Sequence, residues 1–238
     1  MLQTIFKRYE NKYILDERQY QAVLRAIKKH TVPDKYRQSK VCSIYYDTPD
    51  RRLIRASLEK PVYKEKLRLR SYGVPKDNSD CFLELKKKYK GVVYKRRIAA
   101  PYSDCIAYMK GNGKLESSQI RNEIEYFKKF YVVLSPSVDI FYSRLAFYDA
   151  ADPTVRLTFD SDILFRDYEL DLKNGIYGER VLQKGLYLME LKTAGAMPLW
   201  TAEMLTRLKI YPSSFSKYGT AYKIILTEKS QSGGNNCA

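Results

Sequence analysis

The segment VYKEKLRLRSY, residues 62–72, decides which fold the chain can adopt. Successive side chains of a β-strand point to opposite faces of its sheet. Leu67 and Leu69 share one parity of this segment, and the other parity carries four cations in succession: Lys64, Lys66, Arg68 and Arg70. The pattern therefore predicts a strand with one apolar face and one charged face.

Seven other segments also read as strands, and most of them repeat this division between a charged and an apolar parity. They cover residues 5–15, 41–48, 81–88, 91–98, 138–148, 154–163 and 186–193. Amphipathic helices are expected between the strands at residues 17–30, 51–58, 117–134, 198–210 and 220–229. Because the strands are mostly sequential neighbours, they favour an antiparallel sheet that closes on itself.

The expected fold class is α+β, an eight-stranded antiparallel β-barrel with helices packed on the outside. The helices need an apolar surface, which would leave the charged face to line a polar interior. An open sheet with helices on one side and a solvated face on the other satisfies the same pattern, and periodicity does not choose between the two. We expect a single domain over residues 1–228 and a disordered tail over residues 229–238.

The 238-residue chain carries a formal net charge of +16, with 43 Lys and Arg against 27 Asp and Glu. This surplus must either coat the surface or line a site for a polyanion. The single histidine, His30, and four scattered cysteines argue against a His-dependent nucleophile, a zinc cage and a disulfide framework. Without a membrane-spanning apolar run or a signal peptide, a cytoplasmic protein is expected.

Cations and carboxylates share the charged parity of the expected strands. Lys and Arg side chains aligned on neighbouring strands repel one another, so they call for a multiply charged anion. Phosphate chains suit them, because Arg binds phosphate oxygens in pairs and Lys adds point charge. The carboxylates of this parity either pair with cations or hold Mg²⁺ or Mn²⁺ against phosphates: Glu10, Glu84, Asp160, Asp162 and Glu190.

Nine ordered segments resemble the VTC domain, the polyphosphate polymerase domain of the triphosphate tunnel metalloenzymes in the CYTH-like superfamily. The segments are RYENKYIL, SIYYDTPD, KLRLRSYG, FLELKKK, VVYKRRI, FYSRLAFY, VRLTFDSDI, LMELKT and FSKYGTA, and they run from about residue 7 to residue 225. The resemblance implies an eight-stranded antiparallel tunnel that binds a nucleoside triphosphate and a growing phosphate chain.

The resemblance also implies a set of site residues. Eight cations match the family's phosphate-binding positions, where they would carry catalysis: Lys12, Arg68, Arg70, Lys86, Lys95, Arg144, Arg156 and Lys217. Tyr142 and Ser216 match flanking polar contacts, and Arg97 and Lys192 on the charged parity are expected to contact substrate as well. Glu190 matches the metal-holding glutamate, with Glu10 and Glu84 as further candidates for Mn²⁺ or Mg²⁺.

The activity implied is metal-dependent transfer of the γ-phosphate of ATP to inorganic phosphate or a polyphosphate end. The expected partners are ATP, inorganic phosphate, pyrophosphate and polyphosphate. The related CYTH branch of triphosphatases and cyclases starts with an ExExK strand, whereas this chain has Arg8 at the first position and keeps only Glu10 and Lys12. This departure favours the polymerase branch. Eukaryotic members of the family sit in membrane complexes, so a membrane partner is compatible with the sequence.

Two other functions remain open, and a third is disfavoured. The same tunnel suits a metal-dependent tripolyphosphatase or nucleoside triphosphatase, and it also suits a non-catalytic binder of polyphosphate or inositol phosphates. A nucleic-acid-binding protein would explain the charge and the 22 tyrosines. However, the tyrosines lie in strand-like segments where aromatic residues are favoured, and the cations follow strand parity instead of gathering in one helix or tail. We therefore expect no nucleic-acid partner.

Overall fold

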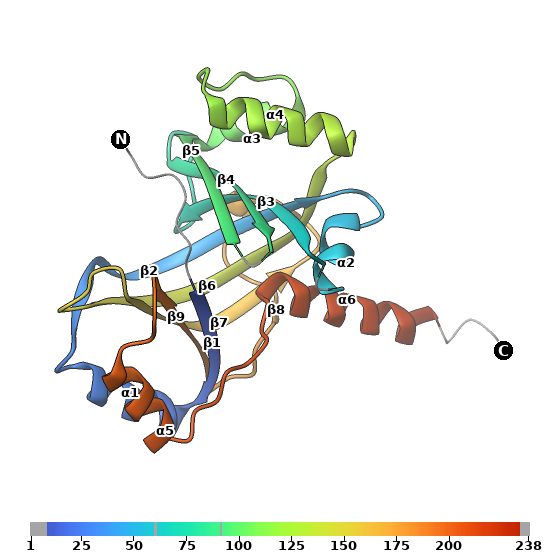
Figure 1. Ribbon diagram of the computed structural model, residues 1–238. Helices are drawn as coiled ribbons and strands as arrows, with labels where there is room; N and C mark the ends of the chain where they lie inside the picture. The colour runs from blue at the N-terminus through green and yellow to red at the C-terminus, as the bar shows by residue number, and fades with distance from the viewer. Residues whose placement is uncertain (1–8, 60, 91, 234–238) are drawn as a thin grey trace. The chain divides into compact units, whose positions relative to one another are not determined.

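The computed structural model describes residues 9–59, 61–90 and 92–233, and within them the chain forms nine strands and six α-helices (Figure 1). The strands are β1 (Tyr9–Asp16), β2 (Thr31–Asp47), β3 (Tyr63–Tyr72), β4 (Asp80–Tyr89), β5 (Val92–Pro101), β6 (Ser135–Asp149), β7 (Arg156–Arg166), β8 (Glu179–Arg180) and β9 (Leu186–Thr193). The helices are α1 (Glu17–Ile27), α2 (Arg52–Leu58), α3 (Tyr102–Lys110), α4 (Gln119–Tyr131), α5 (Leu199–Arg207) and α6 (Lys217–Gly233).

The strands form one antiparallel sheet in the order β1-β9-β7-β6-β2-β3-β4-β5, with the short β8 paired to β7. The path has eight strands, as the sequence predicts. Among the described residues, hydrogen bonds do not join its ends, β1 and β5, so the sheet is not closed by a hydrogen-bonded seam. The predicted α+β class and antiparallel tunnel-type sheet are confirmed.

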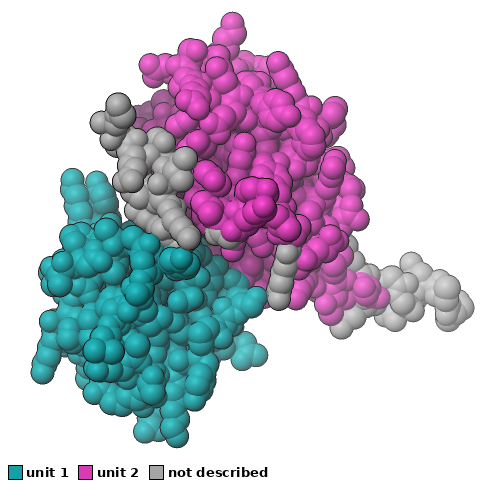
Figure 2. Space-filling model, in the orientation of Figure 1, with its two compact units in different colours: residues 1–40, 142–163, 182–215 teal, residues 41–141, 164–181, 216–238 magenta. Residues whose placement is uncertain are grey.

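The chain divides into two compact units (Figure 2). Unit 1 comprises residues 1–40, 142–163 and 182–215, and unit 2 comprises residues 41–141, 164–181 and 216–238. Strands β2, β6 and β7 each contribute one part of their length to each unit. Every contact described below lies within a single unit.

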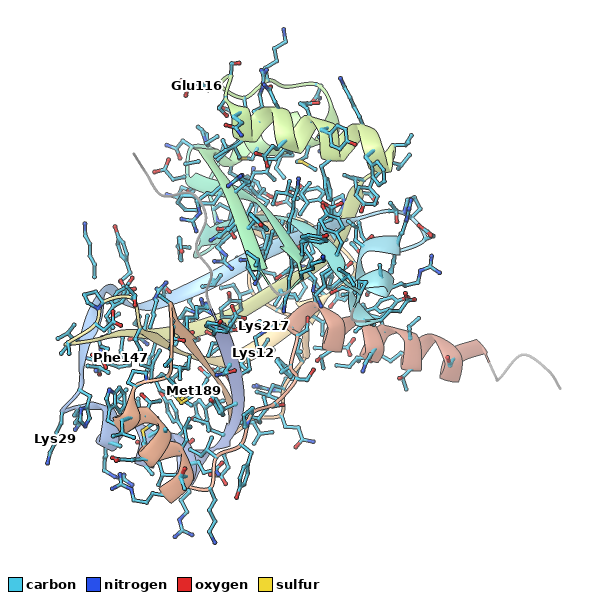
Figure 3. All side chains as sticks on the ribbon, viewed as in Figure 1. Lys12, Lys29, Glu116, Phe147, Met189 and Lys217 are labelled. Carbon is cyan, nitrogen blue, oxygen red and sulfur yellow. The ribbon has the colours of Figure 1, made fainter. Side chains whose placement is uncertain are left out.

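Unit 1 packs the apolar parity of its strands against α1 and α5. Tyr13 of β1 lies opposite Met189 of β9, and both are completely buried. Phe147 and Met189 belong to the same core as side chains of both helices, Val23 of α1 and Met204 of α5 (Figure 3). Because successive residues alternate between faces, this packing leaves the charged parity on the other side of the sheet.

Unit 2 repeats the arrangement with α3 and α4. Leu67 and Leu69 of β3 and Leu83 of β4 are fully buried in a core that also contains Cys105 of α3 and Phe127 of α4. The expected placement of the helices on the apolar face is therefore found in both units.

Local sequence explains where several helices begin. Asp16 precedes α1, and its Oδ1 accepts the backbone N–H of Gln19 at 2.7 Å while the Gln19 side chain accepts the N–H of Asp16 at 3.3 Å. Ser118 caps α4 through the N–H of Arg121 at 3.1 Å. These caps satisfy backbone donors that have no partner within the helix.

Four features differ from the sequence-based expectations, and one of them is the two-residue strand β8, which no predicted segment covers. Helix α3 was not expected, because its segment YSDCIAYMK has only a weak apolar periodicity. Residues 31–40, the first part of β2, are polar and mostly exposed, so they carried no strand signal. The tail was expected to begin at residue 229, but α6 continues to Gly233, and residues 234–238 lie outside the described part of the chain.

In the part of the chain that the structure describes, no helix has the length and apolar character needed to cross a membrane.

The charged face is not an ordinary solvated surface. Glu84 is 1% exposed, Glu190 is 6% exposed, and Asp160 is completely buried. Buried ionised groups are costly unless they are paired. The carboxylates of this face are therefore buried and paired although cations such as Lys95 and Arg97 remain exposed, and these ion pairs form the candidate site.

Candidate phosphate-binding and metal sites

In unit 2, three adjacent strands bring a carboxylate between cations. Glu84 of β4 lies opposite Arg68 of β3 on one side and opposite Arg97 of β5 on the other. Directly opposite residues point to the same face of a sheet, so the three side chains meet there. We call Glu84 with Arg68, Arg70, Lys95 and Arg97 the Glu84 cluster.

The two oxygens of Glu84 are held by short charge-assisted hydrogen bonds. Oε2 accepts Nε and Nη2 of Arg68, both at 2.8 Å. Oε1 accepts Nε and Nη2 of Arg97 at 2.9 and 2.6 Å, and also Nζ of Lys95 at 2.8 Å. Nε of Arg70 lies 3.9 Å from Oε2. One buried carboxylate thus faces four cations.

These charges set the pKa values within the cluster. Burial alone would raise the pKa of Glu84, but the positive charges of Arg68, Arg70 and Lys95 hold it far below its usual range. The Lys95 side chain is 44% exposed; partial desolvation lowers its pKa, although the nearby Glu84 acts in the opposite direction. At neutral pH the cluster therefore carries a surplus of positive charge.

Three lysines lie side by side on the same three strands, and the one on β4 is two residues after Glu84 on the same face. Lys66 of β3 lies opposite Lys86 of β4, and Lys86 lies opposite Lys95 of β5. We call these three residues the lysine row. Like charges directly opposite one another repel, and Glu84 lies 2.8 Å from Lys95 at one end of the row.

Tyr45 of β2 extends the Glu84 cluster. It lies opposite Arg68, and its buried hydroxyl accepts Nη1 of that residue at 3.0 Å. Burial would raise the pKa of Tyr45, but the charges of Arg68, Lys66 and Arg70, with the hydrogen bond from Arg68, lower it to about 8. A phenol in this environment can donate to a phosphate oxygen below that pH and loses the proton above it.

Two predicted residues stand at the beginning of α6. Ser216 accepts the N–H of Gly219 at 3.2 Å, so it caps the helix, and Nζ of Lys66 lies 3.5 Å from the same hydroxyl. Lys217 is the first residue of the helix and is half-buried. The structure therefore places Ser216 beside a member of the lysine row, within unit 2.

In unit 1, Glu190 lies on the middle one of three adjacent strands, β9, as Glu84 does in unit 2. It lies opposite Lys12 of β1 on one side and opposite Thr158 of β7 on the other. Its Oε1 is 3.9 Å from Nζ of Lys12, and its Oε2 is 3.2 Å from Nζ of Lys192 and 3.6 Å from Nη2 of Arg144. We call Glu190 with Lys12, Arg144, Asp160 and Lys192 the Glu190 cluster.

Arg144 is fixed mainly by a second carboxylate. Its Nε and Nη2 bind the two oxygens of Asp160 at 2.6 and 2.7 Å, which is a bidentate pair. Its guanidinium carbon also lies 5.1 Å from the ring centre of Tyr142. Burial would lower the pKa of Arg144, but Tyr142, Asp160 and Glu190 raise it well above its usual value. Arg144 is therefore a permanently charged and oriented cation.

The remaining predicted residues of unit 1 have partners of their own. Nζ of Lys12 lies 3.4 Å from Glu10 and donates to the carbonyl of Phe215 at 2.9 Å. Arg156 binds Asp34 at 2.6 Å through Nη2, while its buried Nε has no hydrogen-bond partner. Arg8, on which the comparison with the ExExK strand depends, lies outside the described residues.

The residues around Glu190 fit a divalent cation better than those around Glu84. The ion pairs of Glu190 with Lys12, Arg144 and Lys192 span 3.2 to 3.9 Å, whereas the bonds from Arg68, Lys95 and Arg97 to Glu84 span 2.6 to 2.9 Å. Beside Glu190, Oγ1 of the fully buried Thr158 has no hydrogen-bond partner.

No group of three or more His, Cys, Asp and Glu side chains among the described residues is arranged to hold a metal. Mg²⁺ commonly binds through one or two carboxylates and takes its other ligands from waters and substrate phosphates. Glu190, with the Thr158 hydroxyl beside it, fits that donor set.

Sequence reasoning did not single out two residues that lie beside these clusters. Tyr45 was part of an expected strand, but its cationic surroundings depend on pairing between β2 and β3. Thr158 shares the parity of Arg156 and Asp160, which was a usable signal, yet its importance comes from an unsatisfied hydroxyl that only coordinates reveal. His30, the single histidine, stacks on Trp200 with ring centres 4.5 Å apart and takes no part in either cluster.

Comparison with known proteins finds one matching family and several solved structures with a similar fold. The model of the VTC domain matches residues 7–226. A structure from Bacillus halodurans, named as a candidate adenylate cyclase, shares 12% identity with a TM-score of 0.54, covering 87% of this chain and 92% of that one. At this identity the likeness shows a common fold.

A second structure, from Hippeastrum, is named as a candidate adenylyl cyclase with a dominant triphosphatase activity. It shares 16% identity with a TM-score of 0.48, and the match covers 88% of this chain and 92% of that one. The comparison with curated proteins gives no match.

Proposed function

The chain belongs to the VTC domain family and has the triphosphate tunnel fold, and on this basis we propose that it is a polyphosphate polymerase. In the proposed reaction, an oxygen of inorganic phosphate or of a polyphosphate end attacks the γ-phosphorus of ATP. The bond between that phosphorus and the β,γ-bridging oxygen breaks. ADP leaves, and the acceptor becomes one phosphate longer.

The lysine row is the observation that carries this proposal. Lys66, Lys86 and Lys95 are cations on three adjacent strands, and the Glu84 cluster beside them has four cations to one carboxylate. Lys95 belongs to both groups, and together they carry more positive than negative charge, which suits a polyanion. A linear phosphate chain supplies several negative charges at short intervals, which one small anion does not.

Positioning and charge neutralisation account for most of the catalysis of phosphoryl transfer, so no covalent nucleophile is needed. Arg144 offers a guanidinium whose orientation Asp160 fixes, and Lys12 and Lys192 add charge within the same unit. Unit 2 offers a corresponding set of cations: Arg68, Arg97 and Lys95. In the proposal these cations bind phosphate oxygens and stabilise the charge of the group in transfer.

Glu190 would hold the divalent cation, with the Thr158 hydroxyl close to it. A bound Mn²⁺ or Mg²⁺ would neutralise phosphate charge during transfer. The loose ion pairs of Glu190 with Lys12, Arg144 and Lys192 permit such binding, because none of them forms a bond as short as those around Glu84.

The test is incubation of the purified chain with ATP and Mn²⁺, followed by gel analysis of the product. We expect polyphosphate longer than the triphosphate donor, together with ADP. The variant Arg144→Gln should abolish this product. Lys173→Gln, which removes an exposed cation paired with Asp77, is the control and should leave it unchanged. Hydrolysis of ATP or tripolyphosphate without any polymer would contradict the polymerase proposal and favour a triphosphatase.

A further inference from the structure

Glu84 is a heavily bonded carboxylate. Five N–H donors from Arg68, Arg97 and Lys95 lie within 2.9 Å of its two oxygens. A carboxylate has about four lone-pair positions. A metal could reach Glu84 only by displacing at least one of these cations.

We propose that Glu84 is a positioning residue, an internal counter-anion that orients the phosphate-binding cations of β3 and β5. This inference rests on the proposed function, because it assigns Glu84 a role toward the same phosphate chain. It replaces a direct role in metal binding with an indirect role through Arg68 and Arg97.

The geometry supports orientation as well as charge compensation. Arg68 and Arg97 approach Glu84 from the strands on either side of β4, and each uses Nε and Nη2, the same edge of its guanidinium. Fixing one edge of a planar guanidinium fixes the direction of the opposite edge. The ring of Phe82, whose centre is 4.3 Å from the guanidinium carbon of Arg97, restrains that plane further.

The number of charges supports a substrate role for these cations. One cation would balance the charge of Glu84, whereas the carboxylate faces four: Arg68, Arg70, Lys95 and Arg97. After compensation by Glu84, the cluster retains three positive charges, and the lysine row extends it. The carboxylate therefore holds the cations at close range without cancelling the charge that attracts phosphate.

The experiment compares the full-length chain with Glu84→Gln and Glu84→Asp. Glutamine keeps the size of the side chain and removes its charge, and aspartate keeps the charge but shortens the reach by one methylene. Glu65→Gln is the matched control, because Glu65 is also a buried carboxylate of this sheet but binds the hydroxyls of Tyr63 and Tyr131.

Three measurements are made on each variant: metal-free binding of tripolyphosphate by calorimetry, turnover of ATP, and the Mn²⁺ concentration that gives half-maximal turnover. We expect E84Q to bind tripolyphosphate at least as tightly as the wild type, because the cluster gains net positive charge. Turnover should fall about 100-fold, since small misplacements of positioning groups cost that much. The Mn²⁺ requirement should not change, and E65Q should match the wild type throughout.

E84D keeps the test valid if E84Q does not fold. It retains the buried charge, so it should melt close to the wild-type temperature, and tripolyphosphate affinity should stay near the wild-type value. Its turnover should remain low, because the shorter carboxylate cannot reach both guanidinium groups. A rise in the Mn²⁺ requirement of either variant, or wild-type turnover in both, overturns the proposal.

NMR spectroscopy of arginine Nε–H groups provides a readout that does not depend on activity. Two slowly exchanging signals, from Arg68 and Arg97, should be present in the wild type and in E65Q and absent in E84Q. A wild type that binds tripolyphosphate and shows these signals but makes no polymer overturns the proposed function alone. Signals of Arg68 and Arg97 that persist in E84Q overturn the inference alone, whereas the signal of Arg144, whose Nε binds Asp160, should persist in every variant.

Discussion

Thr158 of β7 lies directly opposite Glu190 of β9, and its buried Oγ1 has no hydrogen-bond partner. An unsatisfied buried hydroxyl costs free energy unless a ligand completes it. We therefore expect Thr158→Val to raise the Mn²⁺ concentration needed for half-maximal turnover about 10-fold, as removal of groups that support a metal typically does.

Thr158→Ser keeps the hydroxyl and should restore the wild-type Mn²⁺ requirement. Thr201→Val is the matched control, because Thr201 of α5 also has a buried Oγ1 without a partner. Electron paramagnetic resonance of bound Mn²⁺ measures the affinity without turnover. Equal Mn²⁺ binding by the wild type and Thr158→Val would show that the hydroxyl does not contribute to the metal site.

Glu190→Gln should separate metal binding from phosphate binding. The substitution removes one negative charge from among Lys12, Arg144 and Lys192, so metal-free tripolyphosphate binding should be retained or become tighter. Turnover should fall at least 100-fold, because the group in transfer would lose the charge neutralisation that the cation provides. Calorimetry and ADP release measure the two effects, and a parallel loss of both would contradict the assignment.

The lysine row should favour anion binding and lower the stability of the ligand-free protein. Lys86→Gln is expected to weaken tripolyphosphate binding about 10-fold or more, which corresponds to the loss of one charge-assisted hydrogen bond. In the absence of ligand it should melt at the same or a higher temperature, since repulsion from Lys66 and Lys95 is relieved.

Lys87→Gln provides the control for this prediction. Lys87 is the next residue of β4, so it points to the opposite face, and it lies 4.0 Å from Glu123. Its substitution should leave tripolyphosphate binding unchanged. Thermal melting with and without tripolyphosphate compares both variants, and equal behaviour of the two lysine variants would argue against a phosphate-binding role for the row.

Tyr45 should give the phosphate site a dependence on pH. Its pKa is lowered to about 8 in the folded chain, so the phenolate forms as the pH rises through 8 and reduces the positive charge that attracts phosphate. Tripolyphosphate affinity should therefore decrease above pH 8, and this part of the decrease should disappear in Tyr45→Phe. Bound tripolyphosphate should in turn raise the pKa of Tyr45.

Absorbance of tyrosinate near 295 nm follows this titration directly. The neighbouring Tyr46 is the control, because burial raises its pKa, and Tyr46→Phe should leave the step near pH 8 in place. Because a lowered phenol pKa favours the folded state above pH 8, Tyr45 should contribute stability that increases between pH 8 and its unfolded pKa near 10. A wild type without a tyrosinate step near pH 8 would refute this prediction.

Much of the fold could be predicted because alternation along a strand is a local property. Residues 62–72 and 186–193 show which residues face the helices and which face the opposite side, and both cores follow that parity. Helix α3 and residues 31–40 escaped prediction for the same reason, since their sequences carry little periodicity and tertiary packing determines their structure. The resemblance to a family supplied what periodicity could not, the choice between a tunnel-type and an open sheet.

The sequence indicated which residues belong to the charged face, but not which of them form ion pairs with one another. Parity places Glu84 and Glu190 on the same charged face and gives both the same candidate roles. Which cations contact each carboxylate depends on the register between strands, for example Glu84 with Arg68 and Arg97. The contacts of Glu84 from Arg68, Lys95 and Arg97 span 2.6 to 2.9 Å and those of Glu190 span 3.2 to 3.9 Å, a difference that no sequence pattern encodes.

The register of the lysine row has a consequence for selectivity among anions. Neighbouring strands are about 4.8 Å apart, so the backbone positions of three lysines on adjacent strands span about 10 Å. An orthophosphate ion can engage one end of this row, whereas a chain of several phosphates can engage all of it at once. Each contact after the first is made within a molecule that is already bound, so affinity grows with chain length faster than charge alone would predict.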